Sequence, residues 1–593
     1  MTLKPNGFAV LFCSNSKVRK EVHLNFKIKS SGEAIFLSDS GGNIIDSIPA
    51  LTINTNCSIA RIEDGYGQWQ RTTVPTPNQT NQFKTGIVFE KPSGTYLAPF
   101  YLTLKSLDSL TIRYTLNGSE PTVNSPVYIA PLHITERLTE PDIASFVKTG
   151  AVAPDPGGDS FKGNIIRAAQ FINGKRVSKV FTQVYFILEN QKQRYGRADI
   201  ISVSSDYDNL FDSDIGIYVA GQSRKANYSQ RGRAWERPAH LSIINSNGQE
   251  VLNEDIGIRI HGATSRKKRQ KSLRIYARKE YGARLLNYSG FSNTNQTKFN
   301  RLVLRNLMSG WQKTLFKDEL TNYICRNLNF DWLDYKPAVV FLNGEYWGVH
   351  HLREHFDKYY VSNKYGCDKD SVNIVAHGDY KLYFGGKKRL RLKGNGEGHF
   401  ALYDYIYQNN LNDSAAYAHV SDILDIPAII DFYCAQFYFG NTDYLENNNK
   451  LWSYGSNGQW HPVFFDLDGA WDLNVDNLKK IMSENGGTRS APYSTYLFRS
   501  LMKSSIFKKA FLERFKYLLL NDFSSTTVLE ALELFKTEYK PIVKEHIRRW
   551  SYPGSVRQWE RKLNYLESFA THRTNKLVVA IRLVLDAEFD LKP

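Results

Sequence analysis

The stretch Asn441–Asn449 reads NTDYLENNN, and Trp460–Asp468 follows it as the strand-like WHPVFFDLD. The first is the densest group of polar side chains in the chain. Phosphoryl transfer needs a carboxylate beside the attacking hydroxyl and hard oxygen ligands that hold Mg²⁺ on the phosphates. Asp443, Asn448 and then Asp466 present these groups in the required order. The two stretches fit phosphoryl transfer, but as a bare pattern they are a weak signal. Without further segments an ordinary turn is the favoured interpretation, because Asn and Asp clusters commonly form turns.

A nucleotide site also needs a cation for the phosphates. Lys271 precedes a predicted strand at Ser272–Tyr276, where a lysine can reach the α- and β-phosphates. Glu319, on a helix predicted over 313–327, is the candidate carboxylate partner of this lysine. The alternative is that Lys271 belongs to the basic loop Arg266–Arg269. The chain contains no GxGxxG or GxxxxGK[ST], which excludes an ordinary protein kinase and a P-loop enzyme.

The segment His351–His355 reads HLREH and matches the HxxEH pattern of inverted zinc proteases. That chemistry needs both histidines on one face of a helix. Here the segment continues a strand-like run, Tyr346–His350, and we predict a strand rather than a zinc site.

The net charge of the 593-residue chain is +17. An anionic partner is plausible, whether a nucleotide phosphate, an acidic protein, a glycan or nucleic acid, and an inert basic surface is the alternative. No recognisable nucleic-acid-binding motif is present, so we predict no nucleic-acid partner. The basic runs at Arg266–Arg269 and Lys387–Arg389 are typical of solvated loops.

The five cysteines are scattered and form no CxxC pair, so a zinc ribbon is not expected. No apolar run reaches the length of a membrane span, and we predict no transmembrane segment. The N-terminus has no hydrophobic region of a signal peptide and begins almost directly with a strand-like segment at Phe8–Phe12. We therefore expect that an upstream part, including a signal peptide, is missing from this chain.

The predicted secondary structure changes from strands to helices along the chain. Residues 1–85 and 86–188 carry short apolar strands separated by Gly- and Asn-rich turns, which predicts two β-sandwiches. Ser38–Asn43 predicts the turn of a hairpin, Asn173–Gly174 predicts a tight turn, and the Pro- and Gly-rich stretch 153–158 predicts a loop. Strands continue through about 195–360, and helical patterns dominate from about 400 to 593. In the segment 506–518, Phe507, Phe511 and Phe515 recur at helical spacing and predict a core stripe. About three to five folding units are expected for this length.

Several segments together resemble the CotH (spore coat protein H) kinase family over roughly 195–590. The segments that carry the resemblance are Gly257–Gly282, Asn343–Asp357, Asn441–Trp452, Phe464–Trp471, Leu497–Phe515 and Trp559–Arg573. The resemblance implies a reduced, two-lobed, α+β atypical protein-kinase-like domain at 189–593. It also implies transfer of phosphate from ATP to protein with Mg²⁺ or Mn²⁺.

The resemblance also implies roles for particular residues. Asp443 would be the catalytic aspartate, and Asn448 and Asp466 would hold the metal. Lys271 would contact phosphate, with Lys268 and Arg274 as alternatives, and Glu319 would be its partner. Glu354 would lie near the hinge between the lobes at the nucleotide site. Asp318 adjoins Glu319 and is an alternative partner, and Asp468 can assist at the metal or simply shape the loop.

The N-terminal region, residues 1–188, resembles other protein families. Residues 86–188, with Tyr114–Tyr128 and Ile166–Lys175, look like the β-sandwich module at the C-terminus of chitobiases. Residues 1–85, with His23–Asp39 and Trp69, look like the back half of an immunoglobulin-like lamin-tail domain. Such modules beside a CotH domain resemble bacterial surface or secreted proteins, so we expect a secreted or cell-surface location.

Two functions follow from the sequence. The first is an atypical ATP- and metal-dependent kinase that modifies itself or a surface or extracellular protein. The second is a non-catalytic surface protein that uses a kinase-like fold for adhesion or scaffolding, with the β-sandwiches binding protein or glycan. The identity of the phosphate acceptor and the oligomeric state stay open.

Overall fold

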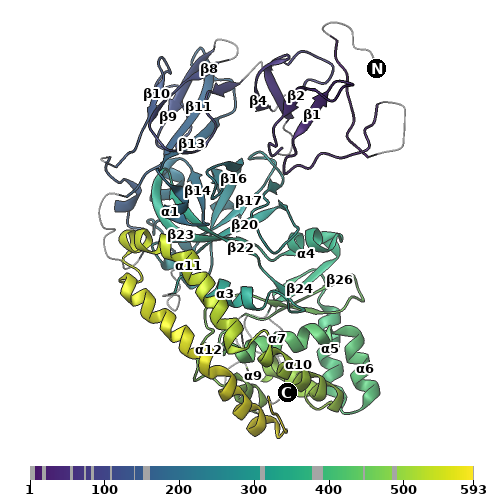
Figure 1. Ribbon diagram of the computed structural model, residues 1–593. Helices are drawn as coiled ribbons and strands as arrows, with labels where there is room; N and C mark the ends of the chain where they lie inside the picture. The colour runs from purple at the N-terminus through teal and green to yellow at the C-terminus, as the bar shows by residue number, and fades with distance from the viewer. Residues whose placement is uncertain are drawn as a thin grey trace. The chain divides into compact units, whose positions relative to one another are not determined.

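The computed structural model divides the chain into two compact units. The first comprises residues 1–305 and 336–352, and the second comprises residues 306–335 and 353–593. The residues that the structure describes are 7–15, 22–53, 58–72, 75–81, 86–106, 110–138, 140–150, 160–307, 314–376, 391–444, 448–483 and 491–591. Strands make up most of the first unit, and helices dominate the second (Figure 1).

The first unit begins with two antiparallel hairpins. Strands β1 (Ile35–Ser38) and β2 (Ile44–Ile48) form one hairpin, and β3 (Ser58–Glu63) and β4 (Tyr66–Thr72) form the other. The turn between β1 and β2 is held by Asp39, whose carboxylate accepts the backbone N–H groups two and four residues later. The hairpin predicted at the Gly-rich turn is therefore confirmed.

The second β-rich segment has a five-stranded sheet in the order β12-β11-β13-β6, with β9 paired to β11 on its other side. Its core contains Leu102, Ile166 and Tyr185, each fully buried. Asn173 and Gly174 both have positive φ, as the predicted tight turn after β11 requires. The predicted loop at 153–158 lies outside the described residues. The strands are β5 (Ile87–Phe89), β6 (Gly94–Tyr96), β7 (Phe100–Leu102), β8 (Leu104–Ser106), β9 (Thr111–Thr115), β10 (Leu132–Ile134), β11 (Asn164–Ile172), β12 (Lys175–Arg176) and β13 (Phe181–Ile187).

The next segment forms a closed barrel in the strand order β14-β15-β16-β17-β20-β23-β22. Its strands are β14 (Asp199–Ser204), β15 (Arg237–Ile244), β16 (Glu250–His261), β17 (Ser272–Tyr276), β20 (Arg301–Asn306), β22 (Tyr335–Leu342) and β23 (Glu345–Glu354). The helices α1 (Gln191–Tyr195) and α2 (Tyr207–Phe211) and the short hairpin of β18 (Leu286–Asn287) and β19 (Lys298–Phe299) accompany it. Alternate residues such as Ile258 and Ile275 are fully buried, as the period of a strand demands.

Buried polar contacts join the second β-rich segment to the barrel within the first unit. The carboxylate of Glu345, at the start of β23, accepts the backbone N–H groups of Ala144 at 2.9 Å and Ser145 at 3.1 Å. The N–H of Gly163 donates to the carbonyl of Gly344 at 2.9 Å. This β-rich segment is therefore packed into the first unit rather than tethered to it.

The second unit combines a five-stranded sheet with most of the helices. The sheet has the order β21-β27-β26-β24-β25 and contains β21 (Asp331–Trp332), β24 (Val372–Ala376), β25 (Arg391–Lys393), β26 (Lys450–Tyr454) and β27 (His461–Phe464). The helices are α3 (Lys317–Ile324), α4 (Lys358–Tyr365), α5 (Glu397–Gln408), α6 (Ser414–Ile423), α7 (Ile426–Tyr438), α8 (Asn477–Met482), α9 (Ala491–Leu501), α10 (Ser505–Leu520), α11 (Ser525–Trp550) and α12 (Val556–Leu585).

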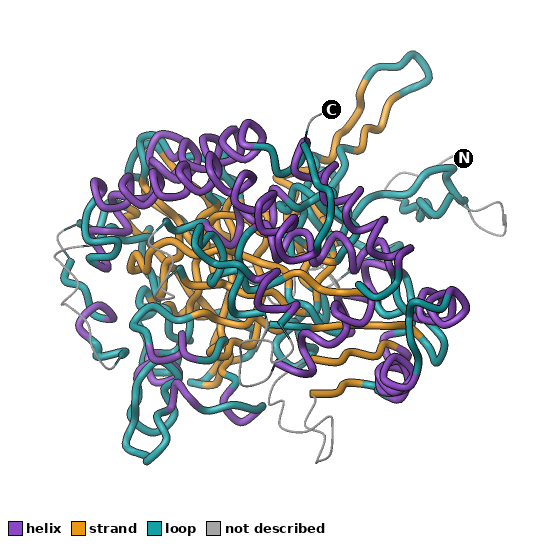
Figure 2. The backbone as a smooth tube through the Cα atoms, turned by 90° about the horizontal axis from the view of Figure 1, so that it is seen from below, coloured by secondary structure: helices purple, strands orange, loops and turns teal. Residues whose placement is uncertain are grey.

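Two sequence predictions about these helices have different outcomes. The core stripe of α10 is confirmed, because Phe507, Phe511 and Phe515 are fully buried. The helix predicted over 313–327 is shorter, at Lys317–Ile324. Leu315, just before it, has a φ of 74°, which a right-handed helix cannot contain. The long helices α11 and α12 lie side by side (Figure 1, yellow). Figure 2 shows the same backbone coloured by secondary structure, with helices in purple and strands in orange.

Arg573 ties α12 to the C-terminal end of α7. Its side chain is almost fully buried, and its guanidinium donates to the carbonyls of Phe437 at 2.6 Å, Tyr438 at 2.7 Å and Val475 at 2.9 Å. Burial lowers the pKa of Arg573 to about 10. The carbonyls of Phe437 and Tyr438 lie at the C-terminal end of α7, where the helix has few donors of its own, so the arginine serves as a cap from a distant helix.

We expect Arg573→Leu to lower the free energy of unfolding by about 3 kcal/mol or more, since it removes the guanidinium donor from the carbonyls of Phe437, Tyr438 and Val475. Urea unfolding followed by circular dichroism measures this change. Arg561→Leu is the matched control, because Arg561 lies on the same helix and is exposed. Equal stability of the two variants would contradict the capping role.

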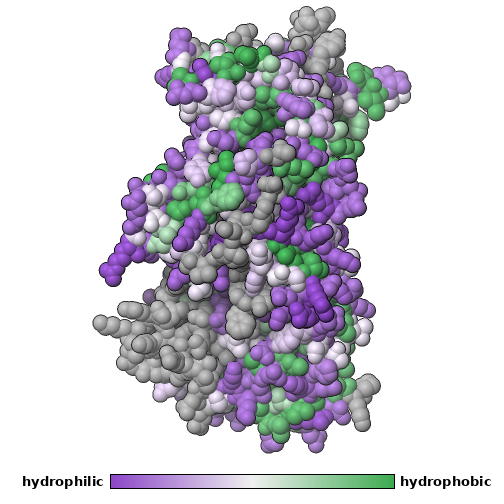
Figure 3. All heavy atoms as spheres, turned by 90° about the vertical axis from the view of Figure 1, so that its left-hand side faces the viewer, coloured by the Kyte–Doolittle hydropathy of each residue, from purple (hydrophilic) through white to green (hydrophobic). Residues whose placement is uncertain are grey.

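Hydrophilic side chains, with smaller hydrophobic groups among them, form the described surface on the face drawn in Figure 3. Within the described part of the chain, no helix combines the length and the apolar character needed to cross a membrane.

Candidate functional site

Four segments of the second unit bring polar side chains together. They are the first turn of α3, the end of β23, the loop that follows α7, and the loop that follows β27. The last of these loops begins at Asp466, whose φ is 58°. Aspartate tolerates this left-handed conformation better than most residues, and such backbone conformations cluster at functional sites.

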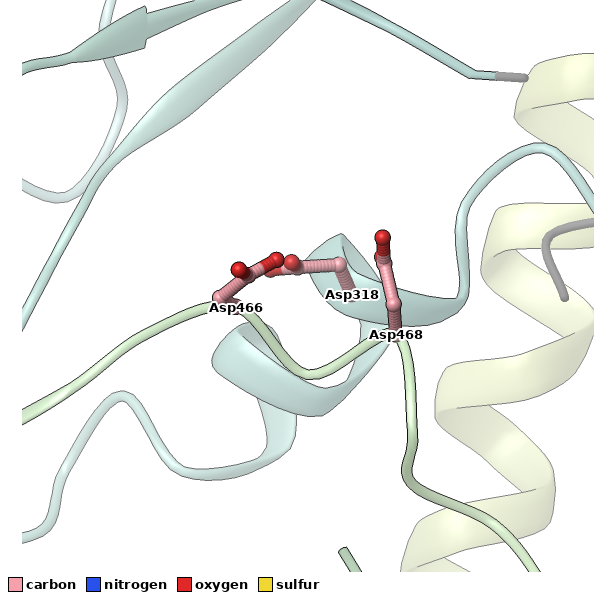
Figure 4. Close-up of side chains that lie close together, drawn as sticks. All are labelled: Asp318, Asp466 and Asp468. Carbon is pink, nitrogen blue, oxygen red and sulfur yellow. The ribbon is translucent and has the colours of Figure 1, made fainter. Parts of the chain in front are cut away.

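Three carboxylates form a compact group in this region (Figure 4). Ligand atoms of Asp318, Asp466 and Asp468 all lie within 4.8 Å of one another. Asp318 comes from α3 and is buried, whereas the other two come from the loop after β27 and are half-buried. In Figure 4 the carboxylates of Asp318 and Asp466 point toward each other, with Asp468 beside them. Such an all-oxygen donor set fits a hard divalent cation such as Mg²⁺ or Mn²⁺.

Asp318 is held in place by two hydrogen bonds and one ion pair. Its carboxylate accepts the N–H of Leu467 at 3.1 Å and the side-chain amide of Asn322 at 2.9 Å. Arg353, at the end of β23, places a guanidinium nitrogen 2.9 Å from the same carboxylate. These contacts fix the Asp318 carboxylate so that it faces the loop after β27.

Lys317 adds a second cation beside the aspartates. Its ammonium donates to the carbonyl of Ala470 at 3.0 Å. Burial lowers the pKa of Lys317 to about 8, while Asp468 and Asp318 act in the opposite direction. Arg353 and Lys317 together offset part of the negative charge of the three carboxylates.

The predicted catalytic and metal residues are brought together in the same region. The amide nitrogen of Asn448 donates to the carboxylate of Asp443 at 2.8 Å and lies 3.4 Å from the carbonyl oxygen of Asp466. Because the amide nitrogen is used in this way, the amide oxygen of Asn448 is the atom left to serve as a ligand.

Gly469 lets the two loops approach closely. A Cβ atom at this position would lie 3.3 Å from the Cβ of Asp443 and 3.1 Å from the amide oxygen of Asn441. Both distances are tighter than usual van der Waals contact, so a side chain here would push the loops apart.

Lys271 lies in the first unit and is fully buried. Its ammonium donates to the carbonyls of Arg266 at 2.7 Å and Lys268 at 2.6 Å, and burial lowers its pKa to about 7. Glu319 lies in the second unit, buried in α3, with its carboxylate 3.9 Å from Arg353. The pairing of Lys271 with Glu319 stays a prediction.

Glu354 occupies a different environment from the three aspartates. Its carboxylate accepts the N–H of Asp334 at 2.8 Å, and burial raises its pKa to about 8. The chain passes from the first unit to the second between Leu352 and Arg353, immediately before Glu354. The predicted location of Glu354 near a hinge and its role at the nucleotide both stay predictions.

The pKa of Lys271 predicts a pH dependence of stability. Its folded pKa of about 7 lies below the unfolded value of about 10.5, so the unfolded state binds more protons between these limits. The free energy of unfolding should therefore rise with pH across this window, by about 1 kcal/mol per pH unit from this residue alone.

Urea unfolding of wild type and Lys271→Met at several pH values between 7 and 10 measures the difference. The variant should lose this part of the slope. Lys267→Met, a change at an exposed lysine of the same loop, should keep it. A slope that is identical in wild type and Lys271→Met would show that Lys271 stays charged in the folded protein.

The HxxEH segment is a strand, as predicted. Residues 351–354 belong to β23, and four residues of extended chain span about 13 Å. His351 and His355 therefore cannot meet at one zinc ion as they would on a helix.

The sequence predicts the carboxylate group only in part. It suggests Asp468 as an assisting group and Asp318 only as a neighbour of Glu319. Arg353 carries no sequence signal of its own, although it lies within the segment Asn343–Asp357 that carries the family resemblance. The acidic pair Asp318–Glu319 in the first turn of a helix is the other sequence feature that points to this group. By itself, such a pair indicates only a stable start of the helix.

The fold and the site define a multidomain protein, with a β-rich N-terminal region and a mixed α/β domain that carries a carboxylate-lined site. The family model described as CotH kinase protein matches residues 258–577, more than half of the chain. The chain belongs to this family, and the predicted resemblance is confirmed.

A second family model, Fn3 associated, matches residues 102–185, within the module predicted at 86–188. The match supports a β-sandwich module ahead of the CotH domain, under a different family description from the chitobiase module. The lamin-tail resemblance of residues 1–85 stays a prediction. A search of curated proteins found no significant match.

Proposed function

We propose that this protein is an atypical kinase that transfers the γ-phosphate of ATP to a protein hydroxyl with the help of Mg²⁺ or Mn²⁺. The observation that carries the proposal is the convergence of Asp443, Asn448 and Asp466. The Asn448 amide contacts the carboxylate of Asp443 and the main chain of Asp466 at once. Membership of the CotH kinase family supports kinase-like chemistry in general.

Each residue has a defined part in the proposed reaction. Asp443 accepts a hydrogen bond from the substrate hydroxyl and orients it toward the phosphorus, then takes its proton as transfer proceeds. Asp466, Asp318 and Asp468, with the amide oxygen of Asn448, would hold the cation. When bound, the cation neutralises charge on the phosphates. Arg353 keeps Asp318 ionised and oriented toward the loop after β27.

Several finer features belong to the proposal. The strand-rich part at about 195–360 and the helical part at about 400–593 act as the two lobes of a kinase-like domain. The N-terminal modules adopt immunoglobulin-like sandwiches that bind protein or glycan. The acceptor is a surface or extracellular protein, and the kinase itself is secreted or displayed on the cell surface.

The test is incubation of the full chain with γ-labelled ATP and Mg²⁺ or Mn²⁺, with and without a chelator. Label should enter the chain itself or an added protein only when metal is present. Asp370→Ala is a control variant, because Asp370 is an exposed carboxylate paired only with lysines. Absence of both transfer and metal-dependent ATP binding would overturn the proposal and favour the adhesive or scaffolding function.

A further inference from the structure

The loop that supplies Asp466 and Asp468 to the carboxylate group is also bound to α3 at its far end. We call residues 466–471 the metal loop. The indole N–H of Trp471, the last residue of this loop, donates to the hydroxyl oxygen of Thr321 at 2.7 Å. Both side chains are fully buried, and both belong to the second unit. This bond therefore joins the helix that contributes one carboxylate to the loop that contributes the other two.

A second contact lies one helical turn earlier on the same face of α3. The ammonium of Lys317 donates to the carbonyl of Ala470 in the metal loop at 3.0 Å. The Thr321 hydroxyl donates its own proton to the carbonyl of Lys317 at 2.7 Å. A hydroxyl has one proton and two lone pairs. Because the proton is used within the helix, Thr321 presents a lone pair to Trp471 in a fixed direction.

The backbone of the metal loop is left-handed at both ends. Trp471 has a φ of 67°, and Asp466 has a φ of 58°. This conformation is unfavourable for a residue as bulky as tryptophan and persists only where the surroundings hold it in place. The N–H of Trp471 donates to the carbonyl of Phe439 at 2.6 Å, and its ring packs against Phe439 and Phe569 with centroid separations of 5.2 Å and 5.0 Å. The bond to Thr321 adds the tie between this strained residue and α3.

A buried indole needs an acceptor in any folded protein, so a bond of this kind can serve stability alone. Trp559 on α12 provides the comparison. It is equally buried, and its indole N–H donates to the carbonyl of Thr314 at 2.8 Å, in the segment before α3. The bond of Trp471 differs in its position, because it lies between the two elements that share the carboxylate group.

We propose that Thr321 and Trp471 are positioning residues of the metal site. Their hydrogen bond fixes the metal loop against α3 and so holds Asp466 and Asp468 in place beside Asp318. Ligands that are already in place lose less freedom when the cation binds, so the bond raises the affinity for the cation. The use of this cation in phosphoryl transfer rests on the proposed function, whereas its binding does not.

Titration of the full chain with Mn²⁺, followed by electron paramagnetic resonance in the absence of nucleotide, tests this proposal. Thr321→Val keeps the size of the side chain and removes the hydroxyl, whereas Thr321→Ser keeps the hydroxyl. We expect Thr321→Val to bind Mn²⁺ about tenfold more weakly or worse, and Thr321→Ser to bind it about as tightly as wild type. Retention in the serine variant would show that the hydroxyl, and not the packing of the side chain, sets the affinity.

Trp471→Phe removes the same bond from the other side and keeps an aromatic ring. It should weaken Mn²⁺ binding by a similar factor. The double variant with Thr321→Val should bind about as weakly as either single variant, because both changes remove one interaction. Trp559→Phe is the matched control, since it removes an equally buried indole bond elsewhere. It should lower the melting temperature and leave the affinity for Mn²⁺ at the wild-type level.

Thermal melts of all variants separate positioning from folding, and if Thr321→Val does not fold, Trp471→Phe still tests the bond. A purely structural role would lower the melting temperatures and leave the affinity for Mn²⁺ unchanged. Wild-type affinity in Thr321→Val or in Trp471→Phe would overturn the positioning role. An equal loss of affinity in Trp559→Phe, or a wild type that binds no Mn²⁺, would overturn it as well.

The outcomes also separate this inference from the proposed function. If wild type binds Mn²⁺, the Thr321→Val and Trp471→Phe variants bind it more weakly, and wild type transfers no phosphate from ATP, the positioning role stands and the kinase function is overturned. If wild type transfers phosphate and all these variants bind Mn²⁺ equally well, the kinase function stands and the positioning role is overturned.

Discussion

Asp466→Asn should reduce metal-dependent phosphoryl transfer on the order of a thousandfold or more. The carboxylate of Asp466 is one of the three that lie within 4.8 Å of one another, and the change replaces its charge by a neutral amide. Asparagine is a better test than alanine, because the φ of 58° at this position is tolerated by asparagine and strained for alanine. Loss of activity then reports on the ligand and not on the loop.

Transfer from γ-labelled ATP and the affinity for Mn²⁺, measured by electron paramagnetic resonance, follow the effect together. Both should fall in Asp466→Asn. Asp472→Asn is the matched control, because Asp472 is an exposed aspartate a few residues further along the same loop. Wild-type transfer and metal affinity in Asp466→Asn would remove Asp466 from the proposed metal site.

Asp443→Asn should lower transfer by about 10²- to 10⁴-fold while leaving the affinity for Mn²⁺ unchanged. Asp443 is not one of the three clustered carboxylates, and its carboxylate accepts a hydrogen bond from Asn448. Asparagine keeps the size of the side chain and an oxygen that can still accept this bond, so the loop should keep its conformation. What is lost is the group that takes the proton of the substrate hydroxyl.

The same two assays distinguish a base from a ligand. If Asp443→Asn weakens Mn²⁺ binding as strongly as Asp466→Asn does, Asp443 belongs to the metal site, and the catalytic role must pass to another residue. A thermal melt of each variant serves as the folding control. Unchanged transfer in Asp443→Asn would exclude it as the group that activates the hydroxyl.

These two variants divide the proposed mechanism into separable parts. The metal site draws Asp318 from one helix and Asp466 and Asp468 from a loop, whereas the proposed base lies in the loop after α7. Arg573 caps the end of that same helix, and its loss should weaken the whole arrangement through stability instead of chemistry. Activity and unfolding measurements on the same variants therefore report on different features.

Much of the local structure could be predicted because its causes are local. Asn173 and Gly174 form the tight turn that their tolerance of positive φ predicts. The strands at Ser272–Tyr276 and in the HxxEH segment, and the buried stripe of α10, follow from periodicities of two and 3.6 residues. The start of the helix at Lys317 could not be read in this way, because Leu315 adopts a left-handed conformation that a leucine alone does not signal.

The sequence by itself determined the family, the order of Asp443, Asn448 and Asp466, and the strands and helices that carry them. Only the tertiary structure decided that Asp318 joins Asp466 and Asp468, that Arg353 holds Asp318, and that Lys271 is buried against carbonyls. The physical reason is the range of the interactions. Turn preferences and periodicity act over a few residues, whereas Asp318 and its hydrogen-bond partner Leu467 are 149 positions apart. Packing of the whole unit brings such residues within contact distance.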